Sequence, residues 1–300
     1  MHSKRSFDAL AWLDTMASEK IRIETILNSF YDRTDINWDI LRTDLLHPVC
    51  SGNKFFKLKY YLLDAVQKNH TTILTSGGAW SNHIVATAFA ARSCQLRAKG
   101  IIRGEKPLKL SQTLQEAQSL GMELEYVSRV HFKDGENPSP EEYIIPAGGY
   151  GQLGARGAGD MLNHVEAANY THILCAVGTG TMLAGLAQAA PNCRVIGIPV
   201  LRYEAIGEEI RQLAPQTNIT LLHEFYEGGY AKKTPQLVKF MNDFYVSTGI
   251  PTDFVYTGKL MFAILQLIHK QYFPPGSRIL AIHSGGLQGN KSLKKGLLVF

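Results

Sequence analysis

Short apolar segments alternate with helical segments through most of the chain, and this alternation limits the fold more than any other feature of the sequence. The segments 71–75 and 172–177 have the length of a buried strand, and each is followed by glycines and then by a run with helical spacing. The same pattern predicts further strands at 96–102, 124–127, 194–199 and 278–283, and helices at 81–92, 108–120, 154–168, 205–213 and 258–272. A strand–helix–strand order indicates a parallel sheet covered by helices, so we expect an α/β fold.

One further helix has a recognisable start. Thr234 is a favoured N-cap residue, and Pro235 follows it at the first helical position, where proline is tolerated best. Apolar residues then recur at helical spacing, namely Leu237, Phe240, Met241 and Phe244. We therefore predict an amphipathic helix from Pro235 onward.

The composition argues against several functional classes. The 300 residues are 45% hydrophobic and carry a net charge of +5, which is ordinary for a folded protein of one large or two modest domains. The lysines at 291–295 fit a solvated surface better than a nucleic-acid site, so we expect no nucleic-acid partner. The four cysteines form no CxxC pair and the histidines show no metal-binding spacing, so we expect no metal and reduced thiols, as in the cytoplasm.

The sequence shows no membrane or secretion signal. The first 20 residues are basic but lack a long apolar core and a small-residue cleavage site. No apolar run approaches the roughly 18 residues that a bilayer-spanning helix needs. We therefore expect no membrane partner and a cytoplasmic protein.

Lys54 occupies an unusual position. It follows Gly52-Asn53 in a turn that runs directly into a helical segment. The start of a helix carries partial positive charge and favours anions, so a lysine there gains nothing in stability. Residues that break a local rule are often functional, and a buried lysine can have a lowered pKa and react with carbonyl groups.

A second glycine-rich turn, Gly178-Thr179-Gly180-Thr181, lies between a predicted strand and a helix that extends through residue 190. In this geometry, backbone N–H groups and threonine hydroxyls bind phosphate, although a simple tight turn would also require small residues. The turn is not a Walker loop and does not have the dinucleotide pattern, so a single phosphate fits better than a longer one.

A third turn places polar residues after a double glycine. Ser81, Asn82 and His83 begin the helix that follows Gly77-Gly78. An N-cap explains one of these residues but not all three, so they form a candidate carboxylate-binding loop, with a purely structural role still open for His83. Another glycine pair, 285–286, follows the last predicted strand, at the sheet edge where α/β folds bind ligands. A lysine, an anion cradle and a substrate loop together indicate a phosphorylated carbonyl cofactor held as a Schiff base.

These motifs carry a resemblance to a known family. The sequence resembles the pyridoxal-phosphate enzymes that include 1-aminocyclopropane-1-carboxylate deaminase and D-cysteine desulfhydrase, of the tryptophan-synthase-β-like fold type II. The similar segments span most of the chain and occur in the family's order: SGNKFFKLKY at 51–60, TSGGAWSNHIVATA at 75–88, PAGGYGQLGARG at 146–157, VGTGTMLAGL at 177–186, YEGGYAK at 226–232, VYTGKL at 255–260 and HSGGLQGN at 283–290.

The resemblance implies an architecture. It predicts two three-layer α/β/α domains with mainly parallel sheets and the cofactor, pyridoxal 5'-phosphate, between them. The small domain would comprise residues 58–156, and the large domain residues 1–57 and 157–300. The resemblance also implies a homodimer that acts on a small amino-acid substrate.

The resemblance also implies roles for individual residues. Lys54 would form the Schiff base, and Lys57 would help to hold the phosphate in the cradle of Gly178, Thr179, Gly180 and Thr181. Ser81 would lie beside the substrate and Asn82 would face the phenolic oxygen of the cofactor. The remaining candidates are His83 as a substrate-binding residue, Tyr230 and Tyr256 as catalytic tyrosines, and Thr257 beside the pyridine nitrogen.

Two positions depart from the family pattern. Phe56 replaces the usual arginine after the Schiff-base lysine, and Ala147 replaces an acidic residue.

Position 257 distinguishes the two reactions. The deaminases have glutamate there, and a carboxylate keeps the ring nitrogen protonated. A threonine hydroxyl supports a weaker electron sink, suited to α,β-elimination of a thiolate. The sequence therefore favours a D-cysteine desulfhydrase-like lyase, with an aminocyclopropane carboxylate deaminase as the alternative. A racemase or dehydratase of another D-amino acid and a silent binding protein also remain open.

Overall fold

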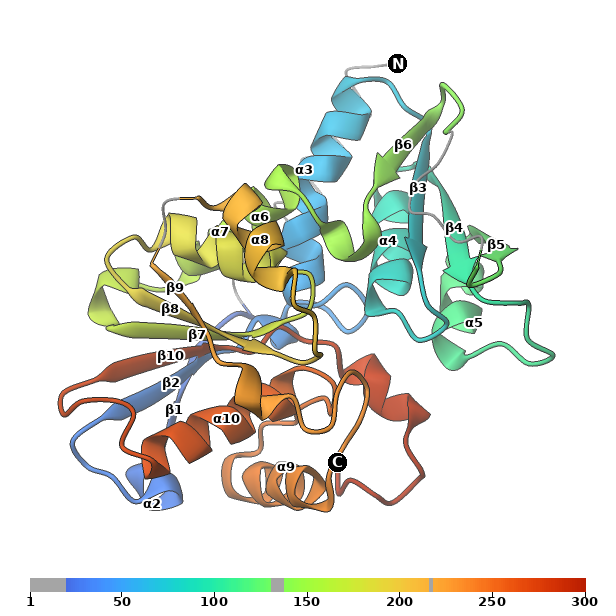
Figure 1. The fold of residues 1–300 in the computed structure, drawn as a ribbon. Helices are drawn as coiled ribbons and strands as arrows, with labels where there is room; N and C mark the ends of the chain where they lie inside the picture. Colours follow the sequence, from blue (N-terminus) through green and yellow to red (C-terminus); the bar gives the residue numbers. More distant parts are fainter. Residues whose placement is uncertain (1–19, 131–137, 216–217) are drawn as a thin grey trace.

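The chain folds around two separate β-sheets, one of six strands and one of four (Figure 1). The computed structural model describes residues 20–130, 138–215 and 218–300. The first 19 residues, on which the interpretation of the N-terminus depends, lie outside these ranges. Within them, no helix is both long and apolar enough to cross a membrane.

The larger sheet has six strands in the order β1-β2-β10-β7-β8-β9. Only β1 and β2 pair in antiparallel fashion, with Ile23 opposite Leu41, and the other neighbours are parallel. The strands are β1 (Ile23–Ile26), β2 (Asn37–Leu41), β7 (His172–Val177), β8 (Arg194–Pro199), β9 (Ile219–Leu221) and β10 (Arg278–Ile282). The predicted strands at 172–177 and 194–199 are confirmed at both ends.

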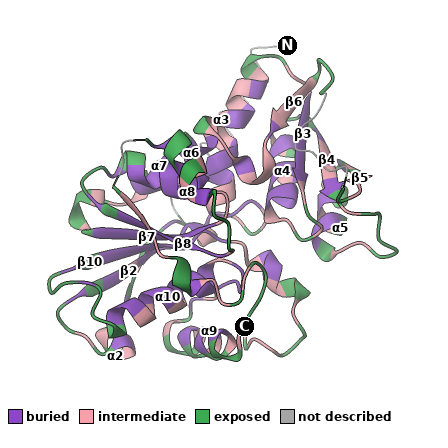
Figure 2. Ribbon diagram, in the orientation of Figure 1, coloured by how far each residue is buried: buried purple, intermediate pink, exposed green. Residues whose placement is uncertain are grey.

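The inner strands of this sheet, such as β7, β8 and β10, are buried on both faces, as their purple colour in Figure 2 shows. In β7, Ile173 and Cys175 pack into one hydrophobic core, while Leu174 and Ala176 pack into a second core on the opposite face. A parallel sheet with two covered faces has continuously apolar strands, and the all-apolar run after His172 has this cause.

Helices cover the two faces of the large sheet (Figure 1). One group packs over the first core: α3 (Asn53–Gln67), α6 (Gln152–Gly159), α7 (Thr181–Ala189) and α8 (Ile206–Leu213). The other group packs over the second core: α2 (Asn28–Tyr31), α9 (Pro235–Thr248) and α10 (Thr257–His269). The predicted start of α9 is confirmed, because the Thr234 side chain accepts a hydrogen bond from the Leu237 N–H at 3.1 Å.

The smaller sheet has four parallel strands in the order β5-β4-β3-β6. They are β3 (Thr72–Gly77), β4 (Arg97–Arg103), β5 (Met122–Val127) and β6 (Glu142–Ile145), and α4 (Asn82–Ser93) and α5 (Gln112–Ser119) pack beside them. All four strands lie within the segment predicted as the small domain, whose exact limits stay a prediction.

The structure corrects some predicted boundaries. The helix expected at 108–120 begins only at Gln112, because the Ser111 side chain caps it by accepting the Leu114 N–H at 3.2 Å. The helix expected at 154–168 is α6, which ends at Gly159 and tightens into a 3₁₀ turn at Asp160–His164. Three glycines in α6 lower its helix propensity, but they let it approach its neighbours closely. A Cβ at Gly157, for example, would lie 1.9 Å from the Phe56 carbonyl oxygen.

Candidate active site

Two adjoining cavities lie where the carboxyl ends of strands in both sheets meet. Their volumes are about 420 and 430 Å³, and Lys54 lines both. The first cavity extends along the turn after β7, and the second extends to the turns after β3 and β10. The residues common to both walls are Asn53, Lys54, Gly148, Thr179, Tyr230 and Tyr256.

Lys54 is fixed by the turn that begins α3. Gly52 has φ +54°, and a Cβ there would lie 2.1 Å from the Ser284 carbonyl oxygen, so only glycine fits. The Gly52 N–H donates to the Thr43 carbonyl at 3.0 Å, and the Asn53 N–H donates to the Ser284 carbonyl at 3.2 Å. The lysine turn is therefore bonded to the chain that follows both β2 and β10.

The environment of Lys54 makes its amine reactive. Burial lowers the pKa of Lys54 from 10.5 to about 8, although the negative charge of Asp253 and the Cys50 thiol act in the opposite direction. A substantial share of the amine is therefore neutral near physiological pH. A neutral amine can attack a carbonyl group or accept a proton.

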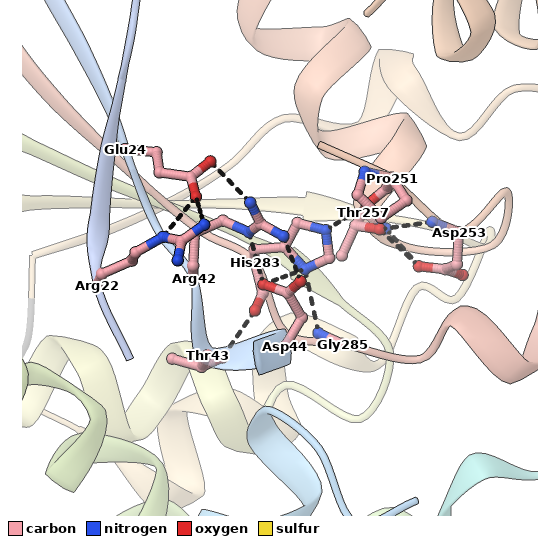
Figure 3. A network of polar contacts seen from close by, with 10 residues as sticks. All are labelled: Arg22, Glu24, Arg42, Thr43, Asp44, Pro251, Asp253, Thr257, His283 and Gly285. Atoms are coloured by element: carbon pink, nitrogen blue, oxygen red, sulfur yellow. Dashed lines mark hydrogen bonds and ion pairs between the residues drawn. The ribbon is translucent and has the colours of Figure 1, made fainter. Parts of the chain in front are cut away.

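A network of polar contacts lies next to the turn that carries Lys54 (Figure 3). The Arg42 guanidinium donates to both carboxylate oxygens of Asp44, through Nε at 2.8 Å and Nη2 at 2.7 Å. Its remaining nitrogen, Nη1, donates to Glu24 at 2.7 Å. The His283 Nδ1 lies 3.3 Å from Asp44, and its Nε2 donates to the Pro251 carbonyl at 2.7 Å. The Thr43 hydroxyl also donates to the His283 carbonyl at 2.7 Å, and this bond joins the chain after β2 to the chain after β10, on which the lysine turn rests.

Lys57 and the glycine turn were predicted to bind an anion, and they line the same cavity. The Lys57 side chain is buried and makes no ion pair with a described residue. Its Nζ donates only to the Gly148 carbonyl, at 3.4 Å. Burial and the charge of Lys54 hold the pKa of Lys57 well below its usual value, so an anion bound here would restore its charge.

The glycine turn completes this site. Gly178, Thr179 and Gly180 line the first cavity together with Lys57. Gly180 has φ +75°, and a Cβ there would lie 2.3 Å from Ile210, so this position also requires glycine. Thr181 lies behind the cavity wall, with its hydroxyl 3.0 Å from that of Thr179. In such a pair one hydroxyl hydrogen remains free to bind an anion.

The predicted substrate loop lines the second cavity with Ser81, Asn82 and His83. Ser81 is also the N-cap of α4, since its Oγ accepts the Ile84 N–H at 3.4 Å. The Asn82 Nδ2 donates to the Gly286 carbonyl at 3.2 Å, which joins this loop to the turn after β10. The buried Oδ1 of Asn82 has no hydrogen-bond partner among the described residues, and such atoms are rare unless a ligand or water satisfies them.

The imidazole of His83 is neutral, with Nε2 as the donor and Nδ1 as the acceptor. The Thr75 hydroxyl donates to the Ile145 carbonyl at 2.7 Å, so the His83 Nε2, 2.9 Å from that hydroxyl, must be the donor of their contact. Its Nδ1 therefore carries a lone pair, and within the described part of the chain this buried atom has no partner. Burial and the charges of Lys54 and Lys57 hold the pKa of His83 well below its usual value.

Two tyrosines form the remaining wall. Tyr230 and Tyr256 line both cavities, and their rings meet edge to face with centroids 6.3 Å apart. Burial, followed by the neighbouring Tyr230, raises the pKa of Tyr256 well above its usual value. Tyr256 therefore remains a protonated phenol at any physiological pH.

Thr257 directly follows Tyr256, but its side chain contacts Asp253. It is fully buried and does not line either cavity. Its hydroxyl donates to the Asp253 carboxylate at 2.8 Å and accepts the Asp253 N–H, also at 2.8 Å (Figure 3). The contact of Thr257 with a ring nitrogen stays a prediction.

Sequence reasoning missed two acidic residues. Asp253 is completely buried, accepts the N–H groups of Val255, Tyr256 and Thr257, and acts on the pKa of Lys54. Its position four residues before Thr257, just ahead of a helix, is an N-terminal signal that could have been read. Glu209 lines the first cavity from α8, and no local pattern marks it.

The two departures from the family pattern have different surroundings. Phe56 is buried, and its ring meets those of Phe55 and His164 edge to face, with centroids 5.4 and 5.7 Å apart. It therefore belongs to the core rather than to a cavity wall. Ala147 lines the second cavity.

Comparisons with known proteins identify the family to which the sequence is similar. The sequence profile of the family described as pyridoxal-phosphate dependent enzyme matches residues 40–285. A Pyrococcus abyssi protein, whose name assigns it provisionally as a 1-aminocyclopropane-1-carboxylate deaminase, is 30% identical over 83% of this chain and 84% of its own. A mitochondrial protein of Arabidopsis thaliana, named as a bifunctional D-cysteine desulfhydrase/1-aminocyclopropane-1-carboxylate deaminase, is 28% identical over 83% of this chain and 72% of its own.

A solved structure has the same fold. The crystal structure described as that of an ACC deaminase homologue aligns with a TM-score of 0.75 at 24% identity, and the alignment covers 94% of this chain and 96% of the other. The expected α/β fold with mainly parallel sheets is confirmed.

The residues present fit pyridoxal phosphate. Lys54 offers an amine of lowered pKa for the aldehyde. Lys57, which pairs with no acidic residue in the ranges that the structure describes, offers a buried amine beside the glycine cradle for the phosphate. Two residues that line the second cavity each have a buried atom with no partner among residues 20–130, 138–215 and 218–300, namely the Asn82 Oδ1 and the His83 Nδ1. The donor set therefore contains a group for each end of the cofactor and further polar groups beside it.

Proposed function

This chain belongs to the family of pyridoxal-phosphate-dependent enzymes, and we propose that it catalyses α,β-elimination on a small D-amino acid, as a D-cysteine desulfhydrase does. D-cysteine and water would yield pyruvate, ammonia and hydrogen sulfide. The observation that carries the proposal is the position of Lys54, on the wall of both cavities and with a pKa of about 8.

The chain's own groups have distinct roles in this proposal. The bound cofactor supplies an electron-withdrawing ring that makes the Cα–H bond of an attached amino acid acidic. Lys54 holds the cofactor and, as a neutral amine, removes the proton at Cα while the thiolate leaves from Cβ. Lys57 and the turn at Gly178–Gly180 hold the phosphate.

The second cavity would bind the amino acid. Ser81 offers a hydroxyl and His83 an unprotonated Nδ1, while Tyr230 and Tyr256 enclose the reacting groups. Tyr256 stays protonated because of the raised pKa described above, so it acts as a hydrogen-bond donor and not as a base. A homodimer is part of the same proposal.

The alternative is a 1-aminocyclopropane-1-carboxylate deaminase, which would release 2-oxobutanoate and ammonia. The names of both relatives described above favour this reading, since each includes the deaminase. Against it stands the threonine at 257, where the resemblance implies glutamate in deaminases. This threonine gives its hydroxyl hydrogen to Asp253 and brings no carboxylate of its own.

One substrate comparison tests the proposal. The purified protein, loaded with pyridoxal phosphate, is given D-cysteine, L-cysteine or aminocyclopropane carboxylate, and sulfide and keto acids are measured. We expect sulfide and pyruvate from D-cysteine, and neither from the Lys54→Ala variant. Efficient release of 2-oxobutanoate without sulfide would favour the deaminase, and no product from any of these substrates would overturn both readings.

A further inference from the structure

Lys259 is a buried cation outside the predicted site. It lies on α10, its side chain is fully buried, and it forms no ion pair with a described residue. Its ammonium group instead donates to three backbone carbonyls: Tyr226 at 2.8 Å, Gly229 at 2.7 Å and Val200 at 3.4 Å. All three hydrogens of the ammonium group are therefore used to hold backbone.

Two of these carbonyls belong to residues 226–232, here called the Tyr230 loop. Four residues of the loop have a positive φ, namely Glu227 at +50°, Gly228 at +83°, Gly229 at +118° and Ala231 at +52°. Left-handed conformations are unfavourable for residues with a side chain, so the loop keeps this shape only where its surroundings impose it. The bonds from Lys259 supply such a constraint at the base of the loop.

The loop carries a residue of the active site. Tyr230 is 56% exposed, yet it lines both cavities and meets the ring of Tyr256 edge to face. Tyr256 directly precedes α10, the helix that carries Lys259. One helix therefore presents one tyrosine and, through its lysine, holds the loop that presents the other.

A contribution to stability alone does not explain why a lysine occupies this buried position. Burial lowers the pKa of Lys259 to about 8, against the opposing effect of the negative charges of Glu227 and Asp253. A buried charge is costly, and an apolar side chain of similar volume often serves stability as well or better. The ammonium group does provide three directed hydrogen bonds, which fix the geometry of a loop that has little packing of its own.

We propose that Lys259 is a positioning residue that holds the Tyr230 loop in place, so that Tyr230 stands over the substrate; the substrate part rests on the proposed function. Without this lysine the two loop carbonyls lose their partner. The loop then samples other conformations and Tyr230 leaves its position opposite Tyr256.

The first test needs no substrate. Hydrogen–deuterium exchange of the cofactor-loaded protein is compared with that of Lys259→Met, and we expect the amides of 226–232 to exchange about 10- to 100-fold faster in the variant. Leu267→Ala is the matched control, since it removes a buried side chain from the same helix and lowers stability generally. Unchanged exchange in the loop of Lys259→Met, or equal acceleration in the control, would overturn the proposal.

The second test uses turnover of the best substrate found above. We expect Lys259→Met to lower kcat/KM by about 10-fold or more, and to have no further effect in a Tyr230→Phe background, because both changes act through one side chain. Losses that multiply in the double variant would contradict the role.

If Lys259→Met does not fold, Lys259→Gln keeps two N–H donors, and it should give loop exchange between that of the natural protein and that of Lys259→Ala. If no substrate is turned over, the exchange experiment still decides about Lys259 while the proposed function fails.

Discussion

The reactivity of Lys54 provides the sharpest test of the site. Its pKa of about 8 compares with 10.5 for an ordinary lysine. At pH 7.5 the neutral fraction would be about 0.24 for the first value and about 0.001 for the second, a ratio of about 240. Cofactor capture at neutral pH therefore depends on the buried environment of this amine.

Competitive labelling measures this pKa directly. Cofactor-free protein is acetylated with trace acetic anhydride between pH 6 and 11, together with N-acetyl-lysine amide as a reference amine. The label on the peptide that contains Lys54 is quantified by mass spectrometry. Limited access of the reagent scales the whole curve but does not move its midpoint, so we expect a midpoint near pH 8, well below that of the reference.

Asp253→Asn provides the directional control. The negative charge of Asp253 favours the protonated form of Lys54, so its removal should move the midpoint to lower pH. A midpoint near pH 10.5 in the natural protein would refute the reasoning about burial. A midpoint that rises in Asp253→Asn would refute the assigned effect of its charge.

Four further outcomes are expected. Ser81→Ala should retain the cofactor spectrum and lose most turnover. Loss of the cap on the Ile84 N–H should lower the free energy of unfolding by only about 1 kcal/mol, and loss of cofactor would contradict the role of Ser81 on the substrate loop. Lys57→Met should weaken pyridoxal phosphate binding by about 10- to 100-fold, measured by fluorescence titration, but not that of pyridoxal, because only the former has a phosphate. Arg42→Met should lower the free energy of urea unfolding by about 3–5 kcal/mol, since it leaves Asp44 buried and without its bidentate partner, and a change below about 1 kcal/mol would argue against the network. Light scattering should give twice the mass of the 300-residue chain, and a pure monomer would exclude the proposed homodimer.

Much of the fold could be predicted because its signals are local. Apolar runs such as 172–177 fix where strands lie, and Ser81 and Thr234 mark helix starts through caps made with neighbouring residues. Strands β1, β2, β6 and β9 were missed, since they are short and mostly of mixed polarity. Their pairing partners are also distant, as in the pairing of β2 with β10, more than 230 residues later.

The candidate site divides in the same way. The sequence alone identified Lys54, the turn at 178–181 and the loop at 81–83 as candidate site segments. This was possible because turns need glycine and caps need short polar residues within a few positions. Only the tertiary structure decided that these segments line two adjoining cavities and that Thr257 gives its hydroxyl hydrogen to Asp253. It also decided that Lys259 binds the Tyr230 loop. Burial and the charges of residues distant in sequence set the pKa of a lysine, and no local pattern encodes either.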